Sequence, residues 1–259
     1  MRGNDRMMLQ PRDLAVARFV GEATVADREQ VRIACGFGST TRVNARLLAL
    51  TEVGILRRFF LGFGAGRKAV YSLSKKGARL VDMPLRGPRR RQNETLVADY
   101  GVDHQLAIND VHCSLAFRPI SGAGVTFRRW LQFHETVVPS LRLIPDGYVE
   151  LETSSGILAA FLEVDLGHEH TSVWKEKTRQ YLQLAVSGDY AHHFGQPRFR
   201  VLVLATSPRR LETIRHAVAA LTEKIFWFAT LEAARGDFFG RIWLRPAGDQ
   251  PQPFIEQIP

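Results

Sequence analysis

Three acidic residues border two apolar segments in the second half of this 259-residue chain. Asp146 follows Pro145 just before the run YVEL, whereas Glu163 and Asp165 end the run ILAAFLEVD. An unpaired carboxylate buried in such a run costs on the order of several kcal/mol. Either these acids cap the ends of two strands, or their oxygens bind a hard cation such as Mg²⁺, which prefers carboxylate ligands and keeps several waters.

The segments around the acids indicate how the chain brings them together. Residues 143–153 and 157–165 read as adjacent strands joined by the polar turn SSG, which favours a hairpin. In a hairpin, Asp146 and Glu163 meet at one end, and Asp165 projects to the same face as Glu163 because it lies two residues further on. We expect one or two helices in 93–117, a strand in 124–138, an amphipathic helix in 171–188, a buried strand in 199–207, and a helix that starts at Ser207.

This order of elements, together with its motifs, resembles the core of the PD-(D/E)xK nucleases. Pro145-Asp146 matches the first motif of that pattern, and Glu163-x-Asp165 matches the second. The segment KTRQYLQL is similar to the helix that follows the acids in RecB-like nucleases. The resemblance implies a Mg²⁺ or Mn²⁺ site formed by Asp146, Glu163 and Asp165, where the metal assists phosphodiester hydrolysis.

One position departs from the nuclease pattern, because Asp165 stands where the pattern has lysine. That lysine orients or activates the attacking water, so a cation from the next helix has to replace it. Lys177 lies about one turn from both Trp174 and Tyr181, beside the apolar stripe, and we expect it to face the acids. Lys175 lies on the opposite flank, where we expect it in solvent. Without a replacement, the site binds metal without cutting or is a relic.

Other polar residues of this half have simpler interpretations. Glu150 and Glu152 alternate along their strand and are expected on a solvated face. Cys35 and Cys113 form no CxxC pattern, so we interpret both as reduced thiols of a cytoplasmic protein and expect no zinc site. The N-terminus has no apolar signal segment, and no apolar run is long enough to cross a bilayer.

Basic charge is concentrated in the first third of the chain. Residues 1–92 contain 19 Lys and Arg against 7 Asp and Glu, a net charge of +12, whereas the whole chain carries +9. The remaining residues therefore have a net charge of −3. Such an asymmetry indicates a module that binds a polyanion, joined to a second part with another role.

The first third predicts three short helices followed by a β-hairpin. The helices are expected near 12–22, from Thr24 to Gly36, and from an N-cap at Ser39 to Gly54. Two strand-like runs, ILRRFFL and AVYSLS, then flank a glycine-rich loop that carries Arg67 and Lys68. This segment, through LSKKG, resembles the MarR-like winged-helix regulators.

In a winged helix the third helix enters the major groove and the hairpin follows the phosphate backbone. The buried face of this helix is expected to hold Val43, Leu47 and Leu50, which leaves polar side chains on the other faces. Arginine favours guanine and asparagine favours adenine. The predicted DNA-binding residues are Thr41, Arg42, Asn44 and Arg46 on the helix, with Arg67 and Lys68 on the wing.

Taken as a whole, the chain resembles the replication-relaxation family of bacterial plasmids and integrative elements, which is thought to assist replication or DNA relaxation. The expected fold is mixed α/β, with α+β organisation overall. A winged-helix domain spans 1–84, a basic linker spans 85–95, and a PD-(D/E)xK nuclease-like domain with a mixed central sheet spans 96–259.

Two classes of function remain open at this point. The first is a DNA-binding protein of a mobile element whose second domain nicks or cleaves double-stranded DNA with Mg²⁺. The alternative is a non-catalytic regulator whose second domain serves dimerisation or recruits replication or mobilisation proteins. A repressor that senses a small molecule is a weaker third interpretation.

Overall fold

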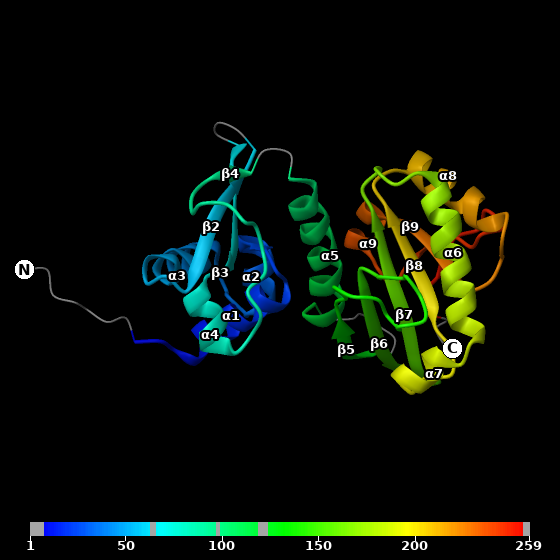
Figure 1. Ribbon diagram of the computed structural model, residues 1–259, viewed down its shortest axis with the longest axis horizontal. Coiled ribbons are helices and arrows are strands. Elements are labelled where there is room, and N and C mark those ends of the chain that lie inside the picture. Colours follow the sequence, from blue (N-terminus) through cyan, green and yellow to red (C-terminus); the bar gives the residue numbers. More distant parts are fainter. Residues whose placement is uncertain (1–7, 63–65, 97–98, 119–123, 256–259) are drawn as a thin grey trace, which may run out of the picture. The chain divides into compact units, whose positions relative to one another are not determined.

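The computed structural model describes residues 8–62, 66–96, 99–118 and 124–255. It divides the chain into two compact units, residues 1–113 and 114–259. Each unit has its own sheet and its own hydrophobic core, and each is described by itself (Figure 1).

The first unit contains five helices and four short strands within its described residues. They are α1 (Pro11–Glu22), β1 (Ala26–Asp27), α2 (Arg28–Ala34), α3 (Thr40–Glu52), β2 (Leu56–Leu61), β3 (Lys68–Leu73), α4 (Lys75–Val81), β4 (Thr95–Leu96) and α5 (Tyr100–Ala116), whose last turn crosses the boundary. The strand order is β1-β3-β2-β4, with β2 antiparallel to β3. The three helices and the hairpin expected from the sequence are present.

Local hydrogen bonds determine where these helices begin. Ser39 caps α3 by accepting from the Arg42 amide at 3.3 Å, as predicted. The second helix begins later than predicted, because Asp27 and Gln30 form a reciprocal capping box. Thr24 instead adopts a positive φ of 62° in the turn before β1.

The hairpin and α4 pack closely against the end of α3. A Cβ added at Gly77 would lie 2.2 Å from the carbonyl oxygen of Ile55, so only glycine permits this approach. This contact explains the glycine of LSKKG. The tip of the hairpin, residues 63–65, lies outside the described residues.

Helix α5 belongs with the first unit, which differs from the predicted domain boundary. The Asn109 side chain donates to the carbonyls of Ala23 and Val25, and Gln30 donates to the Leu106 carbonyl at 2.9 Å. Cys113 is buried in the core of the first unit. These contacts agree with a division in the last turn of α5, after Cys113, and not before the helix.

Residues 85–95, predicted as a solvated linker, run along β2 instead. Arg57 donates to the carbonyls of Pro88 and Arg90, and the Phe60 amide donates to the Glu94 carbonyl at 3.1 Å. Strand β4 then pairs in parallel with the end of β2. Because these backbone groups are satisfied within the first unit, the segment is part of that unit.

The second unit is built on a five-stranded mixed sheet with the order β5-β6-β7-β8-β9. Its elements are β5 (Thr126–Leu131), β6 (Gly147–Thr153), β7 (Gly156–Asp165), α6 (Thr171–Val186), α7 (Asp189–Phe194), β8 (Arg200–Ala205), α8 (Pro208–Ala219), β9 (Phe226–Thr230), α9 (Leu231–Gly236), β10 (Arg241–Trp243) and β11 (Gln252–Pro253). Strands β5, β6 and β7 are antiparallel neighbours, whereas β7, β8 and β9 are parallel. The mixed α/β fold predicted from the sequence is confirmed.

One face of this sheet is covered by α6 and α8 (Figure 1). Both helices contribute to its core, with Trp174 and Tyr181 from α6 and Ile214 from α8 fully buried against the strands. Ser207 caps α8, and the β6–β7 hairpin turns where Thr153 pairs with Gly156, both as predicted. This arrangement holds the ends of β6 and β7 beneath α6.

The described residues contain no helix that is both long and apolar enough to span a membrane.

Candidate functional site

The start of β6 and the end of β7 bring Asp146 and Glu163 to the same face of the sheet. Tyr148 lies opposite Phe161 in the antiparallel register, so Asp146 and Glu163, each two residues further out, share that face. The Asp146 amide donates to the Leu162 carbonyl at 3.1 Å, and the Asp146 Oδ2 atom accepts from the Val164 amide at 2.7 Å. The predicted convergence of these two acids is therefore present.

Glu163 is a buried carboxylate that α6 supplies with two donors. Glu163 is only 1% exposed. Lys177 Nζ lies 2.8 Å from Glu163 Oε2, and the Tyr181 hydroxyl donates to Oε1 at 2.6 Å. Lys177 and Tyr181 are one helical turn apart, which places both on the side of α6 that faces β7. Lys175 is exposed, as expected.

Lys177 also contacts a third acid, Glu169, from the loop between β7 and α6. Its Nζ atom lies 2.8 Å from Glu169 Oε1, so one ammonium group links two carboxylates. The other oxygen, Glu169 Oε2, is buried and has no hydrogen-bond partner among the described residues. Glu169 was not among the residues predicted from the sequence, where its position six residues after Glu163 was the available signal.

The close packing of these charges shifts their proton affinities. Burial raises the pKa of Glu163 to about 7, and Asp146 adds to this effect, while Lys177 and Tyr181 oppose it. For Lys177, burial favours the neutral amine, but the carboxylates of Glu163, Glu169 and Asp146 outweigh it and raise the pKa. The lysine is therefore held as a cation, next to a carboxyl group whose pKa lies above its ordinary value.

Asp165 is held away from this group by a different set of donors. Arg210, at the start of α8, binds it in bidentate fashion, with Nε 2.7 Å from Oδ1 and an Nη atom 2.6 Å from Oδ2. Trp174 Nε1 and the Gly167 amide also donate to it. Although burial opposes its ionisation, these donors hold the pKa of Asp165 below its usual range.

These contacts set Asp165 apart from the other two acids of the predicted metal site. Asp165 lies on the same face as Glu163, but its oxygens are bound by Arg210 and Trp174. Within the described part of the chain, no group of three or more His, Cys, Asp or Glu side chains is arranged to hold a metal ion. The structure instead brings together two predicted acids, Asp146 and Glu163, with the predicted lysine, Lys177.

Glu150 is also not on a solvated face as expected. It is 7% exposed and accepts from the Tyr148 hydroxyl at 2.9 Å and from Arg129 at 3.0 Å. Arg129 belongs to β5, which pairs with β6, so Glu150 faces a side chain of the neighbouring strand and not solvent. Glu152 is exposed, as expected.

Comparison with known proteins assigns the chain to a family. The replication-relaxation family matches residues 17–196, which is more than half of the chain. The chain belongs to the replication-relaxation family. None of the curated protein sequences compared with it matches.

Among solved structures, the restriction endonuclease FokI is similar to this replication-relaxation protein, with 10% sequence identity and a TM-score of 0.32. The match covers 91% of this chain and 45% of FokI, so the chain spans less than half the length of that endonuclease.

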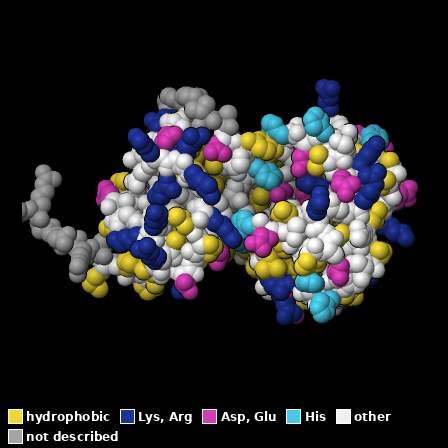
Figure 2. Space-filling model, viewed as in Figure 1, with side chains coloured by type: hydrophobic (Ala, Val, Ile, Leu, Met, Phe, Trp, Pro, Cys, Tyr) yellow, Lys and Arg dark blue, Asp and Glu magenta, His cyan; other side chains and the backbone are white. Residues whose placement is uncertain are grey.

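The first unit of this replication-relaxation protein exposes most of the predicted helix residues. Thr41, Arg42 and Asn44 are exposed on α3, while Val43 and Leu47 are buried. Figure 2 shows Lys and Arg side chains spread over the visible face of this unit, in keeping with its positive charge. The visible face of this unit is thus basic.

Arg46 differs from the other predicted helix residues, because its guanidinium group is bound to another side chain. It forms a bidentate ion pair with Asp13 of α1, a residue that is only 1% exposed. Although burial opposes its ionisation, hydrogen bonds from Arg46 and the Gln10 amide hold the pKa of Asp13 below its usual range. Arg46 therefore joins α3 to α1, and it is not presented to a base edge in this structure.

The predicted wing residues are held in place by neighbours. Arg67 donates to the Thr95 hydroxyl at 2.9 Å and lies over the Phe60 ring. Lys68 Nζ lies 2.5 Å from Asp27, but more than half of the lysine side chain is exposed.

Proposed function

We propose that this replication-relaxation protein binds duplex DNA through its first unit and processes it at the acidic site of its second unit. The observation that carries the proposal is the contact of Lys177 with Glu163, beside Asp146, at the ends of two adjacent strands. A buried ion pair contributes little net stability relative to apolar packing. A charged cluster at the buried ends of two strands is therefore better explained by a chemical role than by a structural one.

The first unit supports the DNA-binding part of the proposal through its order of elements. Three helices, a short strand β1 paired with β3, and the β2–β3 hairpin follow the order of elements expected of a winged helix, which supports this part of the proposal. In this arrangement α3 would enter the major groove with Arg42 and Asn44, and Lys68 would contact phosphate.

The second unit supports the nuclease part through its donor chemistry. Asp146 and Glu163 are hard oxygen ligands, and Mg²⁺ is commonly held by one or two carboxylates and water. The buried oxygen of Glu169, which has no hydrogen-bond partner among the described residues, fits the same cation chemistry. Bound Mg²⁺ would supply Lewis-acid polarisation of a phosphoryl oxygen.

The chain's own residues would then have distinct roles. Asp146 and Glu163 would hold the cation, and Tyr181 keeps the Glu163 carboxylate oriented through its hydroxyl. Lys177 would contribute the positive charge that the nuclease pattern otherwise places at position 165, by hydrogen-bonding a phosphate oxygen or the attacking water.

Replacing Glu163 with glutamine should abolish cleavage and leave DNA binding intact. The amide keeps the shape of the side chain but loses its charge, so we expect nicking or linearisation of supercoiled plasmid in Mg²⁺ or Mn²⁺ to fall at least about 100-fold. Glu152→Gln, at an exposed position of β6, is the matched control and should cleave like the wild type. Equal cleavage by Glu163→Gln and wild type would exclude this site.

One observation favours the alternative, a non-catalytic regulator. Lys177 already pairs with both Glu163 and Glu169, so part of the negative charge of the cluster is compensated without any metal. If wild-type protein cleaves no DNA form in Mg²⁺, Mn²⁺ or Ca²⁺, while duplex binding persists, the regulator is the correct interpretation.

Two arginines of α3 should respond differently to substitution. Arg42→Ala is expected to weaken duplex binding about 5- to 150-fold, as for the loss of a base contact worth roughly 1–3 kcal/mol, without changing stability. Arg46→Ala should instead loosen α1 and α3, because it leaves the buried Asp13 carboxylate without its cation. Fluorescence anisotropy with duplex DNA measures the first effect, and hydrogen–deuterium exchange of α1 and α3 measures the second. Equal behaviour of the two variants would contradict this placement of α3.

A further inference from the structure

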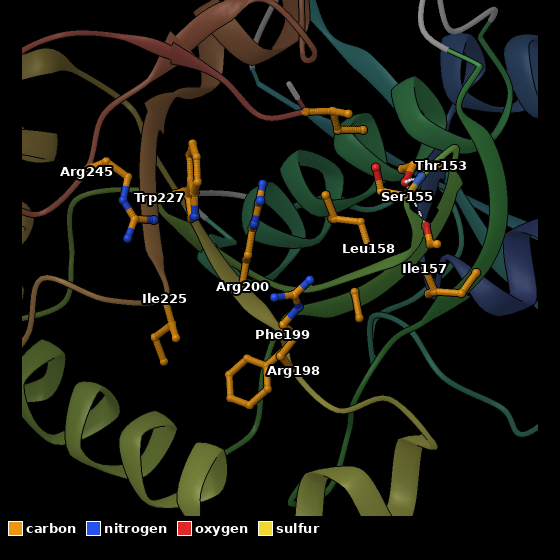
Figure 3. A pocket seen from close by; sticks show the side chains of 13 residues that line it. Thr153, Ser155, Ile157, Leu158, Arg198, Phe199, Arg200, Ile225, Trp227 and Arg245 are labelled. Carbon is orange, nitrogen blue, oxygen red and sulfur yellow. Dashed lines mark hydrogen bonds between the residues drawn. The ribbon is translucent and has the colours of Figure 1, made fainter. Parts of the chain in front are cut away.

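The second unit has a cleft of about 570 Å³ at the opposite end of β7 from the acidic site. It lies where the parallel strands β7, β8 and β9 begin, next to the β6–β7 turn (Figure 3). Its volume is within the range of small-molecule and cofactor sites, roughly 300–1,000 Å³. The cleft is therefore a separate candidate site.

Three arginines line the cleft: Arg198, Arg200 and Arg245. Among the described residues that line it, none is acidic. Arg198 is exposed, and Arg245 donates to a backbone carbonyl, that of Glu223, at 3.1 Å. Within the described part of the chain, the lining thus concentrates positive charge and contributes no carboxylate.

An aromatic ring holds two of these guanidinium groups in place. Arg200 and Arg245 each lie over the ring of Trp227, at 4.5 Å from its centroid, and Figure 3 shows Trp227 between them. Stacked and hydrogen-bonded guanidinium groups lose little further freedom when they bind an anion. The cleft is therefore preorganised for an anion.

The proton affinity of Arg245 is in keeping with an uncompensated charge. Burial alone lowers the pKa of Arg245. In Arg215, by contrast, burial is outweighed by Asp249 and Glu212, and the pKa is raised. A bound anion would give Arg245 the compensation that Arg215 already has.

The remaining wall of the cleft is suited to the uncharged part of such a ligand. Leu158 and Ile225 provide an apolar surface, and the β6–β7 turn contributes Thr153 and Ser155 (Figure 3). A cleft in which arginines are flanked by apolar and hydroxyl-bearing side chains suits a sugar phosphate with its base more closely than a bare inorganic anion. Arginine and aromatic residues also recur in sites that hold single-stranded nucleic acid.

We propose that this cleft binds nucleotide phosphates through Arg198, Arg200 and Arg245, presented on a single DNA strand or as a free nucleotide. The site is independent of the proposed chemistry at Glu163, since it lies at the other end of β7. A protein that binds duplex DNA with its first unit would thereby gain a second contact for an unpaired strand.

The test measures how tightly two probes bind to the full chain. The probes are a fluorescein-labelled 12-mer oligothymidylate and thymidine 5′-monophosphate. The cleft variant is Arg198→Ala/Arg245→Gln, which leaves Arg200 and Trp227 in place. The control variant, Arg179→Ala/Arg241→Ala, removes the same charge from exposed positions outside the cleft. We expect the dissociation constant of the oligonucleotide to rise at least about 10-fold in the cleft variant and to change less than about twofold in the control.

The outcomes separate the two sources of the phosphate. Displacement of the oligonucleotide by thymidine 5′-monophosphate would support a site that accepts a free nucleotide. Loss of oligonucleotide binding in the cleft variant without such displacement would assign the site to a strand. Unchanged binding of both probes in the cleft variant, or an equal loss in the control, would overturn the proposal. Plasmid cleavage is measured in parallel, so failure of this inference is distinguishable from failure at Glu163.

Discussion

Replacing Arg210 with methionine is expected to lower the free energy of unfolding of the second unit by about 3–5 kcal/mol. The change removes both hydrogen bonds of the guanidinium group to Asp165, a residue that is 2% exposed, and its bond to the Glu169 carbonyl. Trp174 and Gly167 then remain as donors, but the carboxylate loses its countercharge in a position that water barely reaches.

Tryptophan fluorescence can follow this effect selectively. All four tryptophans of the chain, at 130, 174, 227 and 243, lie in the second unit. Urea unfolding of Arg210→Met can therefore be compared with that of Arg209→Met, a neighbouring exposed arginine, which should change the midpoint little. If Arg210→Met unfolds like the control, Asp165 does not depend on this ion pair. A second substitution, Asp165→Asn, should recover part of the lost stability, because it removes the buried charge.

Replacing Lys177 with methionine should produce a loss that depends on pH. Removal of the ammonium group leaves Glu163 with Tyr181 as its remaining side-chain donor, and we expect a penalty of about 3 kcal/mol at pH 8. Burial raises the pKa of Glu163 to about 7 in the wild type, so this carboxyl is mostly protonated at pH 5. The penalty should therefore shrink as the pH falls from 8 to 5, since a neutral carboxyl needs no cation.

The control for this prediction is Lys175→Met, which alters an exposed lysine on the same helix. Its unfolding free energy should match the wild type at both pH values. A Lys177→Met penalty that stays constant from pH 5 to 8 would show that the lysine contributes through its contact with the Trp174 ring and not through its ion pair with Glu163. Cleavage assays on the same variants would then report separately on the catalytic proposal.

Much of the candidate site was predictable because it depends on local geometry. The polar turn SSG predicted a hairpin, and the alternation of strand residues then placed Asp146 and Glu163 on one face. Lys177 was predicted from its position beside the buried stripe of α6, which requires only the helical repeat. The replication-relaxation family was likewise predicted from motifs that are short, continuous segments of the sequence.

Other contacts could not be predicted from the sequence, because their partners lie far apart along the chain. Asp165 is 45 residues from Arg210, and Arg46 is 33 residues from Asp13. No local sequence pattern predicts either ion pair. The Arg46–Asp13 pair depends on how α3 packs on α1, and the Arg210–Asp165 pair depends on how α8 packs beside β7. The same reason applies to α5, whose amphipathic pattern predicts a helix but does not state which core it joins.

The sequence alone thus determined the main elements, their order, and the face on which Asp146, Glu163 and Lys177 lie, since hydrogen bonds and side-chain periodicity within a few residues control all three. Tertiary structure alone decided which cation compensates each buried carboxylate. Lys177 lies against Glu163 and Glu169, and Arg210 against Asp165, because α6 and α8 pack on one face of the sheet. The large cost of burying an unpaired charge makes that pairing necessary, but only the packing of distant segments selects the partner.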